Sequence, residues 1–354
     1  MADVQKKQQP LLPHAVDLFC GAGGLSFGMQ QAGINIVAGI DNDPFCKHPF
    51  ESNVKGRFYQ EDIFDLAPEF LASLYPPGHP TVLSGCAPCQ PYSTYTNPIG
   101  HEQRELQPLD KFSELIAAVQ PDIVTMENVS LLTRHEVFSE FLTNLIQSGY
   151  HYNYSVVSCS DYGVPQTRRR LVLLASLLGP IDLPSPSNVD QRELTVKKSI
   201  HHLEQIAAGC ESLTDRLHRA SGLSDTNLRR IRSSTPGGTW KDWDEELRAQ
   251  CHTKTSGRTY SSVYGRMRWD ELAPTITTQF HGYGNGRFGH PEQDRAISLR
   301  EGALLQTFPE TYSFLPDDAV IHTAPIARLI GNAVPVKLGT AIGNAILSHV
   351  STNR

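Results

Sequence analysis

The 354-residue chain lacks the features of a membrane or secreted protein. No apolar run approaches the ~20 residues of a membrane span, and residues 1–10 have no apolar core of the kind that a signal peptide carries. The seven cysteines are odd in number and scattered, and no second Cys-x-x-Cys accompanies Cys86 and Cys89. We therefore expect neither a disulfide framework nor a bound metal, but reduced thiols in a cytoplasmic protein.

The chain also lacks an overall positive charge, since its formal net charge is −6. Its basic residues are unevenly placed, however: residues 216–268 hold eleven Lys/Arg against five Asp/Glu. Such a segment suits a one-sided phosphate-binding surface, although a solvated face is an equally good interpretation. Internal repeats and low-complexity tracts are missing. The length, with 39% hydrophobic and 19% charged residues, predicts a globular protein of roughly two domains.

Residues 1–177 alternate short β-type runs with helix-like stretches, the pattern of a doubly wound α/β domain. Strands are predicted at residues 15–19, 34–40, 81–84, 122–125, 154–158 and 171–176, and helices at 25–32, 110–120 and 136–147. Three prolines within residues 180–186 mark a linker. The irregular chain from 178 to 321 predicts a second, smaller domain. An amphipathic helix at 335–350 is expected to pack back on the first domain, which residues 322–354 would complete.

A glycine loop, Gly21-Ala22-Gly23-Gly24, follows the first predicted strand and opens a helix. Glycines let the backbone approach a ligand closely, and a helix N-terminus offers free N–H groups. No Gly-Lys-Ser/Thr follows, so the loop is not a phosphate-binding P-loop. Asp41 ends the next strand, where a carboxylate binds ribose hydroxyls, and Asp62-Ile63 could add a carboxylate for an adenine amino group. Taken alone, these features fit NAD and S-adenosylmethionine (SAM) equally well.

Cys89 lies just after the predicted buried strand at 81–84, at the end of a strand where clefts of α/β sheets open. Pro88 and Gln90-Pro91 favour an exposed loop over a buried thiol. Cys86 and Cys89 would also suit half a zinc site or a redox pair. The first needs two more ligands, and the second leaves the other motifs unexplained.

Polar motifs follow two further strands. Glu127 and Asn128 come after residues 122–125, and Gln166 precedes three consecutive arginines, residues 168–170. Alternate residues of a strand share a face, so Arg168 and Arg170 are predicted to lie on one side. A cation near Cys89 would lower the pKa of its thiol. The alternatives are an ordinary surface glutamate and a solvated basic strand end.

In this order and spacing, the motifs resemble those of the DNA (cytosine-5) methyltransferase family, over nearly the whole chain outside part of the second domain. Residues 17–24 resemble the SAM loop, 88–90 the nucleophile loop, 127–129 the cytosine-binding acid motif, and 166–170 the family's Gln-x-Arg-x-Arg. Residues 300–309 resemble the segment that braces the smaller domain, and 331–335 resemble the last motif of the SAM pocket.

The resemblance implies how these residues act. C5 of cytosine is a poor nucleophile, and a Cys89 thiolate adding to C6 would turn the ring into an enamine that attacks the methyl group of SAM. Glu127 would protonate or hydrogen-bond N3. Asn128 would hold the loop or orient the base, and Arg168 and Arg170 would reach the cytosine O2 and the Cys89 loop.

For the cofactor, the resemblance implies contacts from Phe19, Gly21, Ala22, Gly23, Gly24, Leu25, Asp41, Asn42, Asp62, Ile63, Asn332 and Ala333. Two residues depart from the family pattern. Ala87 stands where a bulkier residue such as Phe often sits, and Asn42 stands where an apolar residue often stacks on adenine.

The family's variable region, here about residues 178–298, reads DNA. Thr275 and Ile276 resemble a pair that touches the DNA backbone near the target base, which must be flipped out of the stack. Residues 260–268 and 279–288 flank this pair and suit recognition loops, because Arg and Gln read guanine and adenine edges. We therefore expect at least one of Arg266 and Arg268 to contact a base or a phosphate.

The expected function is methylation of a specific duplex DNA sequence by a monomer associated with the nucleoid. A cognate restriction endonuclease acting on the same site, without stable contact, is a candidate partner. The compact chain resembles bacterial or phage enzymes more than multidomain eukaryotic ones. Three alternatives stay open: a tRNA cytosine-5 methyltransferase, a catalytically silent SAM- or DNA-binding module and, more distantly, a Rossmann dehydrogenase.

Overall fold

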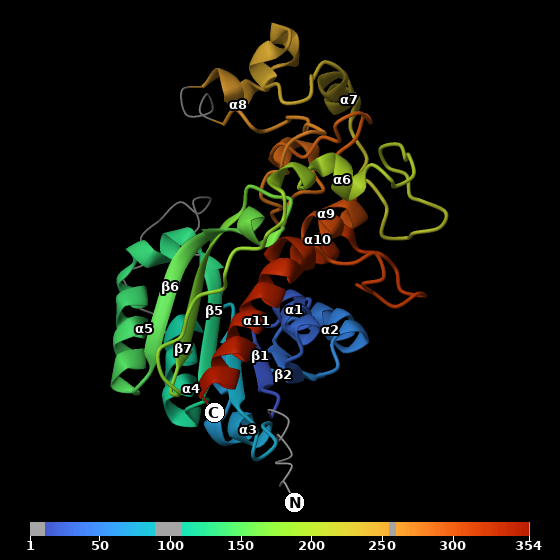
Figure 1. Ribbon diagram of the computed structural model, residues 1–354. Coiled ribbons are helices and arrows are strands. Elements are labelled where there is room, and N and C mark those ends of the chain that lie inside the picture. The colour runs from blue at the N-terminus through green and yellow to red at the C-terminus, as the bar shows by residue number, and fades with distance from the viewer. Residues whose placement is uncertain (1–10, 89–107, 255–259, 354) are drawn as a thin grey trace, which may run out of the picture.

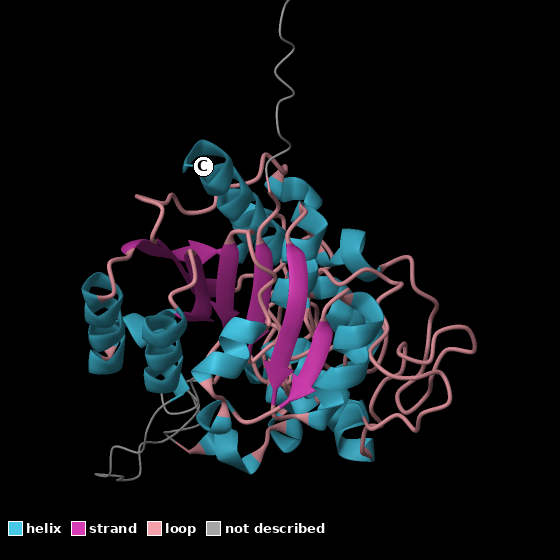
Figure 2. Ribbon diagram, turned by 90° about the horizontal axis from the view of Figure 1, so that it is seen from below, coloured by secondary structure: helices cyan, strands magenta, loops and turns pink. Residues whose placement is uncertain are grey.

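The computed structural model describes residues 11–88, 108–254 and 260–353. These residues form a lower lobe, in which helices cover both faces of a sheet, and an upper lobe of mostly irregular chain (Figures 1 and 2). Helices α9 and α10 lie where the two lobes meet (Figure 1).

The lower lobe is built on a seven-stranded sheet in the order β3-β2-β1-β4-β5-β7-β6. The strands are β1 (His14–Leu18), β2 (Asn35–Asp41), β3 (Arg57–Gln60), β4 (Thr81–Gly85), β5 (Ile123–Val129), β6 (His151–Ser158) and β7 (Arg169–Ser176). The first five strands run parallel, and β7 lies antiparallel between β5 and β6. The predicted doubly wound α/β class is confirmed.

The helices are α1 (Gly24–Ala32), α2 (Lys47–Asn53), α3 (Pro68–Ser73), α4 (Pro108–Val119), α5 (Glu136–Gln147), α6 (Val196–Ile200), α7 (Asp225–Arg232), α8 (Gln250–Thr253), α9 (Leu299–Leu305), α10 (Thr323–Asn332) and α11 (Val336–Asn353). Within the described ranges, no helix combines the length and the apolar character needed to cross a membrane.

Alternation along the strands explains why the sheet is covered on both sides. In β7, Leu171 and Leu173 belong to the hydrophobic cluster that α4 and α5 complete, whereas Val172 and Leu174 belong to the cluster that contains α1 and α11. Successive side chains of a strand point to opposite faces, so a strand with both faces buried is apolar throughout.

The C-terminal helix packs on the first domain, as predicted from its apolar face. Helix α11 lies against α1 with backbones in close approach: a Cβ added at Gly28 would lie 2.4 Å from the Val336 carbonyl oxygen, and one at Gly343 would lie 2.7 Å from the Ala32 Cβ. Glycine at both positions is what permits this approach.

The upper lobe shares its main core with the lower lobe. One buried cluster runs from Met29 and Val172 to Ile276 and Ile297, and two smaller clusters form around Ile231 and Trp240. The division into a catalytic unit (1–177 with 322–354) and a recognition unit (178–321) stays a prediction.

A buried carboxyl lies within the sheet. Asp17 in β1 accepts hydrogen bonds from Ser26 Oγ at 2.5 Å and Ser84 Oγ at 2.8 Å. Burial raises the pKa of Asp17 to about 6, although both hydroxyls oppose the shift. The folded protein therefore holds this proton more tightly than the unfolded chain, in which the pKa is near 3.8.

Replacing Asp17 by asparagine should flatten the dependence of stability on pH. Between pH 4 and 6 the folded state binds more protons at this group, so the free energy of unfolding falls as pH rises, by up to about 3 kcal/mol. Asp17→Asn removes this contribution. Urea unfolding of both proteins from pH 4 to 7 measures this contribution. If the free energy of unfolding changes with pH in the same way in both proteins, the raised pKa of Asp17 is contradicted.

Candidate functional site

The glycine loop lies at the carboxyl end of β1, with Phe19, Gly21 and Gly23 at positive φ (55°, 54° and 82°). A Cβ added at Gly21 would meet no atom within 4 Å, whereas one at Gly24 would lie 2.3 Å from the Val334 carbonyl oxygen. Gly21 thus faces open space, and Gly24 allows the start of α1 to pack directly against the backbone at Val334. The N-cap of α1, Gly23, supplies no side-chain hydrogen bond, so N–H groups of the first turn are available to a ligand.

Asp41 fixes this loop from the neighbouring strand. Its Oδ2 accepts from the Gly21 amide, and its Oδ1 accepts from the Asp43 amide, both at 2.9 Å. Burial raises the pKa of Asp41, which these amides oppose. Each carboxylate oxygen has a second lone pair, so the group can also accept from the hydroxyls of a ribose.

The other residues predicted to contact the cofactor gather around the same loop. Asn42 Nδ2 donates to Asp62 Oδ2 at 3.3 Å, which joins the ends of β2 and β3. Ala333 Cβ would be 3.3 Å from a Cβ at Gly24, and Asn332 beside it is exposed. An adenosine-containing cofactor fits here, because the backbone can approach it and carboxylates border the space.

An ion pair between a buried glutamate and a half-buried arginine lies across β5 and β7. Glu127 is 6% exposed, and its Oε1 is 3.1 Å from Nε of Arg170. Strand β5 continues to Val129, so Glu127 lies inside the strand. The sequence pattern instead predicts a strand that ends at residue 125, with Glu127 just after it. Burial raises the pKa of Glu127, while Arg170 and then Arg168 oppose the shift. Such a carboxyl keeps a proton to higher pH than an ordinary glutamate, which suits a general acid.

Asn128 connects this pair to the chain that leads to Cys89. Its Nδ2 donates to the Ala87 carbonyl at 3.1 Å, and both residues are buried. Cys89 itself lies outside the described residues. Asn128 therefore holds the segment just before Cys89 against β5.

The two predicted arginines have different environments. Arg168 is 2% exposed and donates to the carbonyls of Ile276 (3.0 Å), Gly331 (3.4 Å) and Ala333 (3.2 Å). Burial lowers its pKa to about 9. Of the two arginines, Arg170 forms the ion pair with Glu127, whereas Arg168 is directed at backbone carbonyls, so the two side chains do not share one set of partners. That both reach the base stays a prediction. Arg168 precedes β7, where the alternation that we assumed does not apply.

Gln166 and Gln306 bind the same backbone segments as Arg168, and neither of them was assigned a role from the sequence. Gln166 accepts from the Ile276 amide at 2.9 Å and donates to Gln306 Oε1 at 2.8 Å. Gln306 donates in turn to the carbonyls of Ile330 (2.8 Å) and Ala333 (3.1 Å). Both lie in segments that resemble family motifs, which was the available signal.

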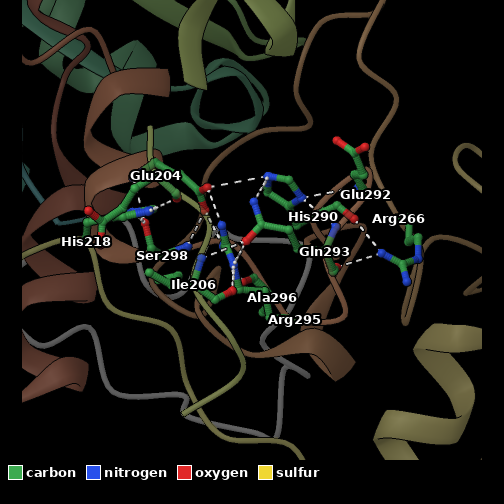
Figure 3. Close-up of polar contacts among 11 residues, drawn as sticks. Glu204, Ile206, His218, Arg266, His290, Glu292, Gln293, Arg295, Ala296 and Ser298 are labelled. Atoms are coloured by element: carbon green, nitrogen blue, oxygen red, sulfur yellow. Dashed lines mark hydrogen bonds and ion pairs between the residues drawn. The ribbon is translucent and has the colours of Figure 1, made fainter. Parts of the chain in front are cut away.

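Arg266 corrects a further expectation. It is 5% exposed, it donates to the carbonyls of Ile231, His290 and Gln293 at 2.7–3.0 Å, and it forms an ion pair with Asp294. Figure 3 shows the guanidinium directed at the loop of His290 and Gln293. A side chain used in this way does not fit a DNA contact.

The other residues predicted to contact DNA differ in how far they are exposed. Arg268 is 46% exposed and forms ion pairs with Asp270 and Glu271 at 3.1 and 3.3 Å. Ile276 is fully buried, and Thr275 beside it is half-buried. Arg268 and Thr275 stay candidates.

The fold and the site together define an α/β enzyme of the SAM-dependent, Rossmann-like methyltransferase class. The family model described as "C-5 cytosine-specific DNA methylase" matches residues 14–348, and the chain belongs to this family. The activity of the protein is therefore that of a DNA (cytosine-5) methyltransferase. This excludes the dehydrogenase, and the family implies DNA as the substrate.

Similar proteins agree with this assignment. The chain is 51% identical to the Type II methylase M.HgiDII of Herpetosiphon aurantiacus, over 94% of each chain, and 30% identical to the Type II methyltransferase M1.HphI of Haemophilus parahaemolyticus, over 96% of this chain and 87% of that protein. Among solved structures, a protein described as a DNA modification methyltransferase encoded within a prophage (E. coli) matches with a TM-score of 0.73 at 20% identity, over 96% and 99% of the chains. A DNMT2 mutant of Spodoptera frugiperda matches with a TM-score of 0.63 at 16% identity, with the same coverage. Both solved structures support the fold.

Proposed function

We propose that the enzyme transfers the methyl group of SAM to C5 of a cytosine flipped out of a specific duplex sequence, through a covalent bond between Cys89 and C6. The observation that carries the proposal is the ion pair of the buried Glu127 with Arg170, beside Asn128, which holds the segment leading to Cys89. The acid thus lies beside the residue that holds Ala87, two positions before the proposed nucleophile.

The cofactor would bind at the adjacent ends of β1, β2 and β3. When bound, SAM supplies an electrophilic methyl group on a sulfonium. The open side of Gly21 and the first turn of α1 would receive the amino-acid part, Asp41 the ribose, and Asp62 the adenine amino group. Phe19, Ala22, Leu25, Ile63, Asn332 and Ala333 would complete the pocket.

The protein's own groups would then act in a fixed order. The Cys89 thiolate adds to C6, and its electron pair forms the C6–S bond. Glu127 gives a proton to N3, so that the ring becomes an enamine. C5 then forms a bond to the methyl group as the bond between that methyl group and the sulfonium breaks, and N3 returns its proton to Glu127. A base removes the C5 proton, the C5–C6 double bond re-forms, and the C6–S bond breaks to release Cys89. Arg170 keeps Glu127 oriented toward the base.

The similar proteins carry the name Type II methylase or methyltransferase, which supports a restriction endonuclease as a partner. We propose that a restriction endonuclease acts on the same sequence without stable contact, and that the methyltransferase works as a monomer in the cytoplasm.

DNA with 5-fluorocytosine at the target should become covalently trapped on the enzyme. Fluorine at C5 cannot leave as a proton does, so elimination of Cys89 stalls after methyl transfer. Bisulfite sequencing of DNA methylated by the enzyme first identifies the target. A denaturing gel should then show a shifted band that requires SAM and that is missing with ordinary cytosine. No band at a site that the enzyme methylates would refute the covalent mechanism.

A further inference from the structure

The arginines around the predicted recognition loops are largely engaged within the protein. Arg266 is buried among carbonyls, and Arg287 donates to the Gly238 carbonyl at 2.7 Å. Arg268 is exposed but paired with two carboxylates. Exposed polar side chains other than arginine in these loops are therefore further candidates for reading bases.

The segment after Ile276 is fixed to the catalytic lobe at its base. Gln166 and Arg168 bind the Ile276 amide and carbonyl. A Cβ at Gly331 would lie 2.4 Å from the Thr277 carbonyl carbon and 2.5 Å from the Thr278 nitrogen, so the two backbones are in direct contact. A side chain just after Thr278 is therefore held at a fixed position relative to the lobe that carries Glu127 and Arg170.

Gln279 is the exposed residue that follows, and Asn285 orients it. Asn285 Nδ2 donates to the Gln279 backbone carbonyl at 3.2 Å and to the Gln279 side-chain Oε1 at 3.3 Å. A backbone carbonyl can only accept, so the group of Asn285 that faces it is the NH2. The Gln279 atom that receives its second hydrogen must then be the oxygen. Gln279 Nε2 has no partner within the described parts of the chain, and it offers two N–H donors.

Gly282 makes this arrangement possible. A Cβ at this position would lie 2.3 Å from Asn285 Nδ2. The φ of Gly282 is −107°, which any residue adopts. Glycine is thus required here by the position of the Asn285 amide, not by the backbone conformation.

We propose that Gln279 determines specificity by reading a guanine edge in the major groove of the recognition sequence. Guanine presents two acceptors there, O6 and N7, which match a group that offers only donors. A bidentate contact with adenine needs the amide oxygen as well, and Asn285 engages that oxygen. The inference rests on the proposed function, because it requires a specific duplex target.

The inference predicts different changes in specificity for different variants. Gln279→Ala should remove the preference for guanine at one position, with a roughly tenfold to hundredfold loss of discrimination there. Asn285→Ala and Gly282→Ala keep Gln279 but release its amide, so the same position should accept adenine as well as guanine. Gln279→Glu should reject guanine, because it replaces the donors with an acceptor. Gln205→Glu, an exposed glutamine of the same lobe, is the matched control and should keep the parent's preference.

Bisulfite sequencing of a random duplex library, methylated in vitro by each variant, measures the preference at every position. A second arm places 7-deazaguanine, which lacks N7, at the implicated position. The parent should methylate this duplex more slowly than its guanine counterpart, and Gln279→Ala should not distinguish the two. Calorimetry with SAM verifies that each variant is folded.

The outcomes separate the two levels of the proposal. An active parent, with a Gln279→Ala variant that keeps every base preference, would overturn the inference alone. A uniform loss at all positions would also overturn it, since it would indicate a phosphate contact or a structural role. A parent that methylates no DNA would overturn the proposed function and the inference with it.

Discussion

Replacing Cys89 by alanine should reduce methyl transfer to less than about a hundredth of the parent rate while leaving SAM affinity nearly unchanged. The loss is large because without the thiolate the ring does not become an enamine, and C5 stays a poor nucleophile. SAM affinity should persist because the proposed pocket is formed at the ends of β1, β2 and β3, whereas Cys89 follows β4.

Incorporation of tritiated methyl groups into DNA measures the first effect, and calorimetry with SAM measures the second. Cys210, an exposed cysteine of the upper lobe, provides a matched control in Cys210→Ala, which should behave like the parent. Residual activity of Cys89→Ala above a hundredth of the parent rate would rule out its role as the nucleophile.

Glu127→Gln should lower the rate of methyl transfer by about 10²- to 10⁴-fold, because glutamine can hydrogen-bond to N3 but cannot give it a proton. The pH dependence should change as well. Burial raises the pKa of Glu127, so the parent loses activity as pH rises through that pKa and the acid becomes ionised. The variant should lack this decline.

Single-turnover rates across pH test both expectations, because they exclude product release. Glu69→Gln, on the exposed surface of α3, serves as the control for the change of charge. A Glu127→Gln variant within tenfold of the parent, or one that keeps the parent's pH profile, would show that another group protonates the base.

The sequence allowed most of the sheet to be predicted, because buried strands and amphipathic helices have periodic signals. All six predicted strands are present, as are the helices at α1, α4, α5 and α11. Strand β3 was missed because it has only four residues, Arg-Phe-Tyr-Gln, of which one is buried. Its apolar content is too low to produce a pattern.

The roles of the arginines could not be predicted in the same way. Arg168 and Arg266 are buried by carbonyls that lie far along the chain, and no local pattern distinguishes them from the exposed Arg268. Motif resemblance singled out the segments around Glu127 and Arg170, which the structure brings together, but the partner of each side chain depends on tertiary packing. The contact between Gln279 and Asn285 has the same origin.

The contacts of Arg168 and Gln166 have a consequence for how such enzymes diverge. At the junction of the lobes these side chains bind main-chain atoms of Ile276, Gly331, Ala333 and Leu305, apart from one bond to Gln306. A carbonyl or an amide is present whatever residue occupies a position. Substitutions at exposed positions of residues 279–288 can therefore accumulate, and a different target sequence can evolve, without loss of the hydrogen bonds that fix the recognition loop to the catalytic lobe.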